Sequence, residues 1–242
     1  MAPAHGIRGT DASGPAEPST TRFLNWCSNA AYDGGMTALQ GSLLDLADDV
    51  VVRPLRGLSR MPLAHGAWVD VLPAWVGGAD VLYSVLRREV PWHAERRQMY
   101  DSIVDVPRLL KFYGEGEALP HPALEECRAA LSRHYAAELG EPFLTAGLCL
   151  YRDGQDSVAW HGDRIGRSKD LDTIVAILSV GAPRDLMLRP RGGGSSIRVP
   201  AGHGDLVVMG GSCQRTWDHC VPKTAKPVGP RISVQFRPSG VR

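Results

Sequence analysis

Two side chains that bind metals lie two residues apart in the segment WHGD, where His161 is followed by Asp163. Side chains two apart on a strand point to the same face, so this imidazole and this carboxylate can reach one ion. The candidates for a third ligand are His203 and His219. His203 lies between glycines in AGHGD, which is typical of a turn, whereas His219 directly precedes the segment CVP, whose proline would end a strand. We therefore predict His161, Asp163 and His219 as the ligand set.

Two histidines and one carboxylate on one side of an ion leave three coordination positions open. Non-haem Fe(II) oxygenases use that arrangement, because O2 and a bidentate cosubstrate occupy the open positions. The H-x-D pair by itself also fits a surface histidine beside an aspartate in a turn, so the prediction depends on residues further along the chain.

Those residues lie in the segment PRISVQFRP, which carries four polar side chains at even spacing: Arg231, Ser233, Gln235 and Arg237. Even spacing puts all four on one face of a strand. Two arginines inside a β-barrel are costly unless they pair with anions, and the guanidinium fork matches carboxylates. 2-Oxoglutarate has two carboxylates. The alternative is an edge strand with both arginines in water.

The rest of the chain predicts an α+β, mainly β fold. Amphipathic spacing predicts helices at 36–48, 75–89 and 122–138, and residues 51–72 are broken by proline and glycine, which predicts an extended loop. Beyond residue 145, short runs rich in Val, Ile and Leu alternate with turn residues, as in antiparallel sandwiches and barrels. This order predicts N-terminal helices packed on one face of a β-core.

Length and composition give the domain organisation. The 242 residues are 43% apolar and 22% charged, which suits one globular domain. We expect a flexible tail at 1–20 and a single domain at 21–242, with a helical, lid and recognition region at 21–142 and a catalytic core at 143–242. The five cysteines include no C-x-x-C pair, which favours free thiols in a reducing cytoplasm. Residues 161–242 hold 13 basic and 6 acidic side chains, a net +7 that suggests an anionic partner.

The segments LCLYRDG, WHGD, GGSCQRTWDHCVPK and GPRISVQFRP, in this order, resemble the AlkB family of Fe(II)- and 2-oxoglutarate-dependent nucleic-acid dealkylases. The resemblance covers roughly residues 90–238 and implies a double-stranded β-helix (jelly-roll) core. It implies iron on His161, Asp163 and His219. It implies that Arg231 pairs with the distal carboxylate of 2-oxoglutarate, while Arg237 lies near the carboxylate that chelates iron.

Three further positions match the family's cosubstrate pocket. Tyr151 matches a tyrosine that binds the cosubstrate, and Ser233 matches a small polar position beside it. Cys149 stands where the family often has asparagine, and a thiol cannot donate the amide hydrogen bond. The implied reaction is oxidative demethylation of N-alkylated bases such as 1-methyladenine or 3-methylcytosine, with O2 and 2-oxoglutarate consumed and succinate, CO2 and formaldehyde released.

The basic and aromatic segment VPWHAERRQMYD is the predicted lid over the substrate base. Its side chains could contact phosphate and stack on a base. The position two residues after Asp163 often holds an acid in the family but is Ile165 here, which leaves base selectivity open. The predicted substrate contacts are Trp92, Arg97, Met99, Tyr100, Arg108 and Arg164.

Two alternatives stay open from the sequence. The same enzyme class could hydroxylate a small molecule, a protein or a tRNA base, and a non-catalytic β-sandwich would bind no Fe(II). For partners we expect alkylated nucleic acid, with DNA favoured and RNA possible, no membrane, and a monomeric chain in the cytoplasm.

Overall fold

The computed structural model describes residues 49–99, 102–164 and 166–241. Every described residue belongs to one compact unit, residues 41–242. The predicted tail at 1–20, the domain boundary at residue 20 and the predicted helix at 36–48 lie outside the described residues.

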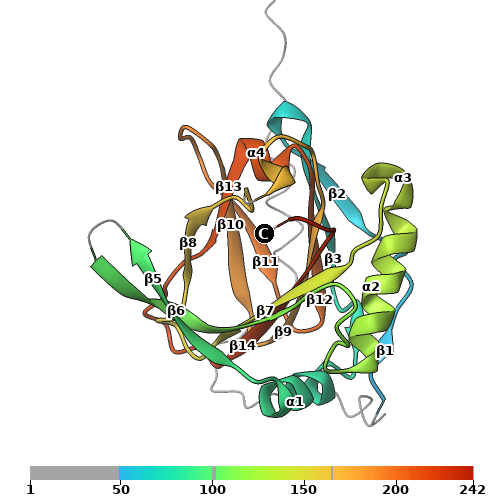
Figure 1. The fold of residues 1–242 in the computed structure, drawn as a ribbon, viewed down its shortest axis with the longest axis vertical. Helices are drawn as coiled ribbons and strands as arrows, with labels where there is room; N and C mark the ends of the chain where they lie inside the picture. Colours follow the sequence, from blue (N-terminus) through green and yellow to red (C-terminus); the bar gives the residue numbers. More distant parts are fainter. Residues whose placement is uncertain (1–48, 100–101, 165, 242) are drawn as a thin grey trace, which may run out of the picture. The chain divides into compact units, whose positions relative to one another are not determined.

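Two antiparallel sheets face each other in this unit (Figure 1). The larger sheet has the order β2-β3-β12-β9-β14-β7-β6-β5 and the smaller sheet the order β11-β10-β13-β8, while β1 pairs with β4 alone. The predicted fold class, mainly β with a jelly-roll core, is confirmed. The strands are β1 (Val51–Val52), β2 (Ser59–Pro62), β3 (Ala67–Leu72), β4 (Val76–Gly77), β5 (His93–Met99), β6 (Ser102–Tyr113), β7 (Thr145–Tyr151), β8 (Val158–His161), β9 (Val175–Gly181), β10 (Arg184–Pro190), β11 (Ile197–Ala201), β12 (Asp205–Gly211), β13 (Trp217–Val221) and β14 (Arg231–Arg237).

The larger sheet is covered on both faces, which explains why its central strands are so apolar. Along β9, Val175 and Ile177 belong to the core between the two sheets, while Ala176, Leu178 and Val180 belong to the core under the helices. Successive side chains on a strand point to opposite faces. All seven residues of β9 are therefore buried.

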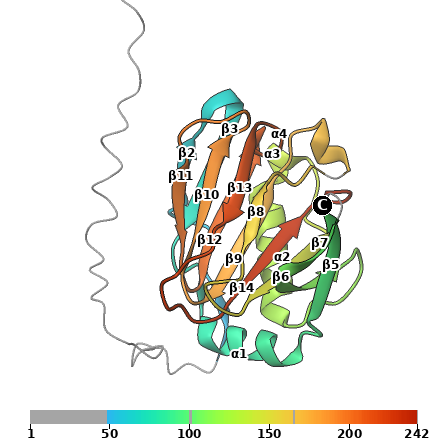
Figure 2. The same ribbon diagram turned by 90° about the vertical axis from the view of Figure 1, so that its left-hand side faces the viewer.

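The helices pack on the outer face of the larger sheet, as predicted. Helix α1 (Ala79–Glu89) contacts β9 and β14, and Leu124, Leu131 and Tyr135 of the α2 region join the same core. Figure 2 shows the two sheets from the side. The remaining helical elements are α2 (Pro122–His134), α3 (Ala136–Leu139), α4 (Cys213–Thr216) and the 3-10 turns η2 (Ala64–Gly66) and η3 (Arg167–Lys169).

Three local predictions differ from the structure in the type or the bounds of the element. The segment at 51–72 contains three strands, of which β2 and β3 extend the larger sheet. The helix predicted at 75–89 begins at Ala79 rather than residue 75, because Gly78 adopts a left-handed φ of 63° that ends β4 and turns the chain. The helix predicted at 122–138 breaks at Tyr135, with φ −95° and ψ 12°, and α3 follows it.

None of the helices in the described part of the chain is both long and apolar enough to span a membrane.

Candidate metal and cosubstrate site

The two histidines and the aspartate predicted from the sequence meet inside the fold. His161 ends β8, His219 lies in β13, and the two residues are paired in register across the smaller sheet. Their ring centroids lie 4.3 Å apart. The ligand atoms of His161, Asp163 and His219 all lie within 4.8 Å of one another, which is the spacing that one shared metal ion requires.

The ring of His161 is held in the orientation that metal binding needs. Its Nδ1 lies 2.8 Å from the carbonyl oxygen of Ala159. A carbonyl can only accept, so Nδ1 carries the proton and donates it, and Nε2 is left with a free lone pair. This carbonyl contact is the usual way in which proteins fix the tautomer of a metal-binding histidine.

Arg237 orients the carboxylate of Asp163. Its Nε and Nη2 both lie 2.8 Å from Oδ2, while Oδ1 faces His161 Nε2 at 3.6 Å. The aspartate therefore presents one oxygen to the site and gives the other to the arginine. Arg237 fits on the inner face because Gly147, on the neighbouring strand β7, has no side chain; an added Cβ there would come within 2.9 Å of the guanidinium.

The protonation states of Asp163 and His219 suit a cation. Burial alone would raise the pKa of Asp163, but Arg237 and the two histidines outweigh burial and lower that pKa to about 2. Burial, together with the nearby His161, lowers the pKa of His219 to about 3. At neutral pH one ligand is therefore anionic and the other is neutral, so neither has to lose a proton before it binds a metal.

The β14 arginines point into the space between the sheets. Ile232, Val234 and Phe236 of β14 face the core under the helices, so the alternating residues Arg231, Ser233, Gln235 and Arg237 face inward. Arg231 is only 2% exposed, which rules out the alternative of an edge strand with this arginine in water.

Arg231 has hydrogen-bonding capacity that the described part of the chain leaves unused. Its Nε donates to Ser179 Oγ at 2.8 Å, but its buried Nη1 has no hydrogen-bond partner. Burial lowers the pKa of Arg231, as expected for a cation out of water. A carboxylate ligand would accept a hydrogen bond from this free donor and neutralise the buried charge.

Tyr151 and Cys149 lie next to this arginine on β7. The register pairs Tyr151 with Arg231 and Cys149 with Ser233. The Arg231 guanidinium lies 5.2 Å from the Tyr151 ring centroid, and burial raises the pKa of the tyrosine hydroxyl to about 12, so it remains protonated as a donor. The Cys149 sulfur lies 3.7 Å from Gln235 Oε1, and the Gln235 amide contacts the Ser233 hydroxyl.

Two residues at the site were missed in the sequence. Gln214 is 1% exposed, and its Oε1 accepts a hydrogen bond from Asp163 N at 3.0 Å. The contact is close because Gly162 leaves room for the α4 backbone: a Cβ there would meet Gln214 O at 2.6 Å. Arg184 is 6% exposed and lies 5.7 Å from the Tyr151 ring. Both residues contact groups that are distant in sequence, so no local sequence pattern predicts these contacts.

The predicted lid forms a strand rather than a loop. Strand β5 pairs with β6 at the edge of the larger sheet. Arg97 and Met99 lie in β5, but their side chains, like the whole of Tyr100, lie outside the described residues. Trp92, just before β5, packs against the core under the helices, and its buried Nε1 has no hydrogen-bond partner among the described residues.

The other two predicted substrate contacts bind within the chain. Arg108 Nη1 donates to Ser157 O at 3.1 Å, and its Nε is buried without a partner. Arg164 lies 3.5 Å from Asp218, whose side chain therefore points away from the triad, since β13 directs His219 inward. Neither contact brings these arginines into the triad.

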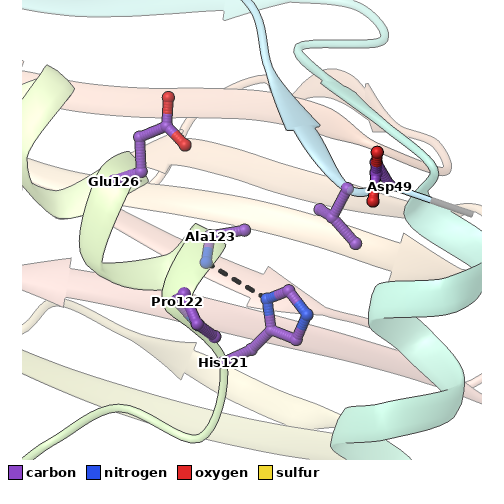
Figure 3. A pocket seen from close by; sticks show the side chains of 6 residues that line it. Asp49, His121, Pro122, Ala123 and Glu126 are labelled. Carbon is purple, nitrogen blue, oxygen red and sulfur yellow. Dashed lines mark hydrogen bonds between the residues drawn. The ribbon is translucent and has the colours of Figure 1, made fainter.

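A cavity of about 310 Å³ lies at the start of α2, and none of its lining residues belongs to the triad or to the β14 arginines. Figure 3 shows His121 there accepting a hydrogen bond from Ala123 N, at 3.1 Å. This contact caps the helix. The cavity is therefore not part of the metal site.

Comparison with known proteins agrees with this geometry. Residues 112–237, which include the triad and both β14 arginines, match the family model of the 2OG-Fe(II) oxygenase superfamily. The chain is 32% identical over 200 residues to alpha-ketoglutarate-dependent dioxygenase alkB homolog 3 of Bos taurus, and equally to that of Homo sapiens. Each match covers 75% of this chain and 66% of the relative.

A second relative is DNA oxidative demethylase ALKBH2 of Homo sapiens, which is 29% identical over 182 residues. This match covers 66% of the chain and 68% of the relative. With the triad, the inward arginines and the family match in the same stretch, the chain belongs to the 2OG-Fe(II) oxygenase superfamily and, within it, to the AlkB family.

Proposed function

We propose that this protein is an Fe(II)- and 2-oxoglutarate-dependent dioxygenase that removes methyl groups from the ring nitrogens of nucleobases in DNA or RNA. In the overall reaction, the methylated base, 2-oxoglutarate and O2 become the unmethylated base, formaldehyde, succinate and CO2. The observation that carries the proposal is Arg231, a buried cation with an unused hydrogen-bond donor. It lies on the same inward face of β14 as Arg237, which binds Asp163.

The donor set fits both the metal and the cosubstrate. His161 Nε2, Asp163 Oδ1 and a nitrogen of His219 would hold Fe(II), and two imidazoles with one carboxylate are the ligand set that Fe(II) oxygenases use. Arg231 and the protonated Tyr151 hydroxyl would bind the distal carboxylate of 2-oxoglutarate. When bound, iron and 2-oxoglutarate supply the oxidant that is made from O2 as the 2-oxo acid loses CO2.

The chain's own residues would orient this chemistry. Arg237 keeps one oxygen of Asp163 occupied, so the other is free to bind metal. Gln214 holds the backbone of Asp163, and the Ala159 carbonyl holds the His161 ring. These contacts hold the metal ligands in place, which is the preorganisation that lowers the cost of assembling a reactive site.

Nucleic acid is the proposed substrate class because one relative, ALKBH2 of Homo sapiens, is a DNA oxidative demethylase. The strongly basic balance of residues 161–242 is in keeping with an anionic polymer. A base inside a duplex would have to leave the stack to reach the iron. We therefore expect single strands to be better substrates than duplexes, unless contacts with the protein offset the free energy of unstacking.

A substrate panel tests this function. We expect formaldehyde and succinate in equal amounts from oligonucleotides that carry 1-methyladenine or 3-methylcytosine, with neither product from the unmethylated sequences. Binding should weaken as salt rises, since phosphate contacts release counterions. DNA and RNA, single-stranded and duplex, belong in the panel. Succinate without formaldehyde across the panel would contradict demethylation and favour hydroxylation of a small molecule, a protein or a tRNA base.

A further inference from the structure

Arg184 lies on the inner face of the smaller sheet, at the end of the fold that also holds Arg231. It begins β10, and the even spacing to Leu186 and Leu188 places the three on one face, where both leucines belong to the core between the sheets. Leu188 is paired with His219, so Arg184 is about 13 Å further along the strand from the level of the metal ligands. Gly181, three residues before Arg184, is paired with Arg231.

The guanidinium of Arg184 is held entirely by main-chain carbonyls. Nη1 donates to Asp153 O at 2.9 Å, and Nη2 donates to Asp156 O at 3.0 Å and to Pro222 O at 2.6 Å. These carbonyls belong to the loop after β7 and the loop after β13, so one side chain ties both loops together. The Asp156 carboxylate in the first loop binds Arg152 instead, which donates hydrogen bonds to both of its oxygens.

Arg184 and Arg231 both lie against one tyrosine. Their guanidinium carbons lie 5.7 Å and 5.2 Å from the centroid of the Tyr151 ring, within the range of a cation–π contact. Burial lowers the pKa of both guanidinium groups, and the charge of Arg184 lowers the pKa of Arg231 further.

Two buried like charges near one ring are unfavourable unless an anion compensates them. Neither guanidinium has a carboxylate as a hydrogen-bond partner among the described residues. Carbonyl groups satisfy the donors of Arg184, and burial, which lowers its pKa, outweighs the charges of Asp153, Asp156 and Asp185, which raise it. An anion bound beside Arg231 would interact favourably with both charges.

We propose that Arg184 is a positioning residue that makes the cosubstrate pocket select a dicarboxylate, by adding a second positive charge near Arg231 and by holding the Tyr151 ring against which both arginines lie. This inference rests on the proposed function, because it assumes that the distal carboxylate of 2-oxoglutarate binds at Arg231. Arg184 itself need not touch the ligand, since its donors are already used by carbonyls.

The test compares two ligands that differ only at the far end. 2-Oxoglutarate and 2-oxovalerate have the same number of carbons and the same metal-chelating 2-oxo acid, but 2-oxovalerate lacks the distal carboxylate. Binding of each is titrated under anaerobic conditions to the Fe(II)-loaded protein, and by calorimetry to the Mn(II)-loaded protein, so no turnover is needed. The variants are Arg184→Met, Arg184→Lys and, as the surface control, Arg198→Met, which removes an exposed arginine paired with Asp185.

We expect Arg184→Met to weaken 2-oxoglutarate binding about tenfold, as for the loss of one nearby charge, and to change 2-oxovalerate binding less than about twofold. Arg184→Lys should restore most of the affinity, and Arg198→Met should change neither ligand. If Arg184→Met fails to fold, Arg184→Gln takes its place, because glutamine can still donate to a loop carbonyl.

Two results would overturn the inference. Equal weakening of both ligands would mean that Arg184 is structural only, and no weakening of either would mean that its charge does not reach the pocket. If the wild-type protein binds neither ligand, the proposed function itself fails and this inference fails with it. Wild-type binding with an unaffected variant would overturn the inference alone.

Discussion

Replacing Arg231 with methionine is expected to weaken 2-oxoglutarate binding by about a hundredfold or more. Removing one partner of a buried, hydrogen-bonded charge pair typically costs about 3 kcal/mol or more, and about 1.4 kcal/mol corresponds to a factor of ten in affinity. Methionine keeps the length and most of the apolar volume of the side chain. Calorimetric titration of the Mn(II)-loaded protein with 2-oxoglutarate measures the effect directly.

The stability of the same variant separates binding from folding. In the ligand-free protein Arg231 is buried, and its Nη1 has no partner, so removing its charge should leave the melting temperature unchanged or raise it. The exposed Arg198 is the matched control, because Arg198→Met should alter neither property. A large drop in the melting temperature of Arg231→Met would contradict a ligand-binding role, since the arginine would then stabilise the fold itself.

Replacing His219 with glutamine is expected to abolish Fe(II) binding at micromolar concentrations and turnover with it. Changes in residues that only orient a ligand typically cost about 10- to 100-fold in metal affinity, and loss of a ligand itself should exceed that range. Glutamine fills a similar volume, so the buried site should not collapse. Metal content after gel filtration and succinate release measure the two effects.

His203 provides the matched control, because the sequence alone leaves it as the other candidate ligand. Its Nδ1 accepts a hydrogen bond from Gly181 N at 2.8 Å, and its Nε2 lies 3.2 Å from Asp80. It belongs to a turn outside the triad. His203→Gln should therefore retain iron and activity while lowering stability modestly, and loss of iron from this variant would contradict the assignment of His219.

The strands of the core were predictable because their residues alternate in polarity or are apolar throughout. The run TIVAILSV, which becomes β9, is typical of a strand covered on both faces. By contrast, HAERRQM forms β5, although its sequence has no strand-like alternation of apolar and polar residues. An edge strand buries little, so main-chain pairing with β6 determines its structure instead of side-chain pattern.

The residues of the site likewise include some that a sequence pattern could predict and some that it could not. Arg231 and Arg237 could be predicted because their even spacing puts them on one face of β14. His161 and Asp163 could be predicted because they are two residues apart, although β8 ends at His161 and Asp163 lies just beyond it. Arg184 could not, because it binds carbonyls of two loops that are 31 and 38 residues away from it. Such contacts exist only after the two sheets have come together, and backbone acceptors carry no residue type that a sequence pattern could reveal.

The central claim is that Fe(II) and 2-oxoglutarate bind together at His161, Asp163 and His219. Adding Fe(II) and then 2-oxoglutarate to the protein without oxygen should produce a charge-transfer absorption band in the visible range, because the cosubstrate chelates the metal through its 2-oxo acid. The band should be absent in His219→Gln and should require a much higher 2-oxoglutarate concentration in Arg231→Met. A folded wild-type protein that gives no band would contradict the account.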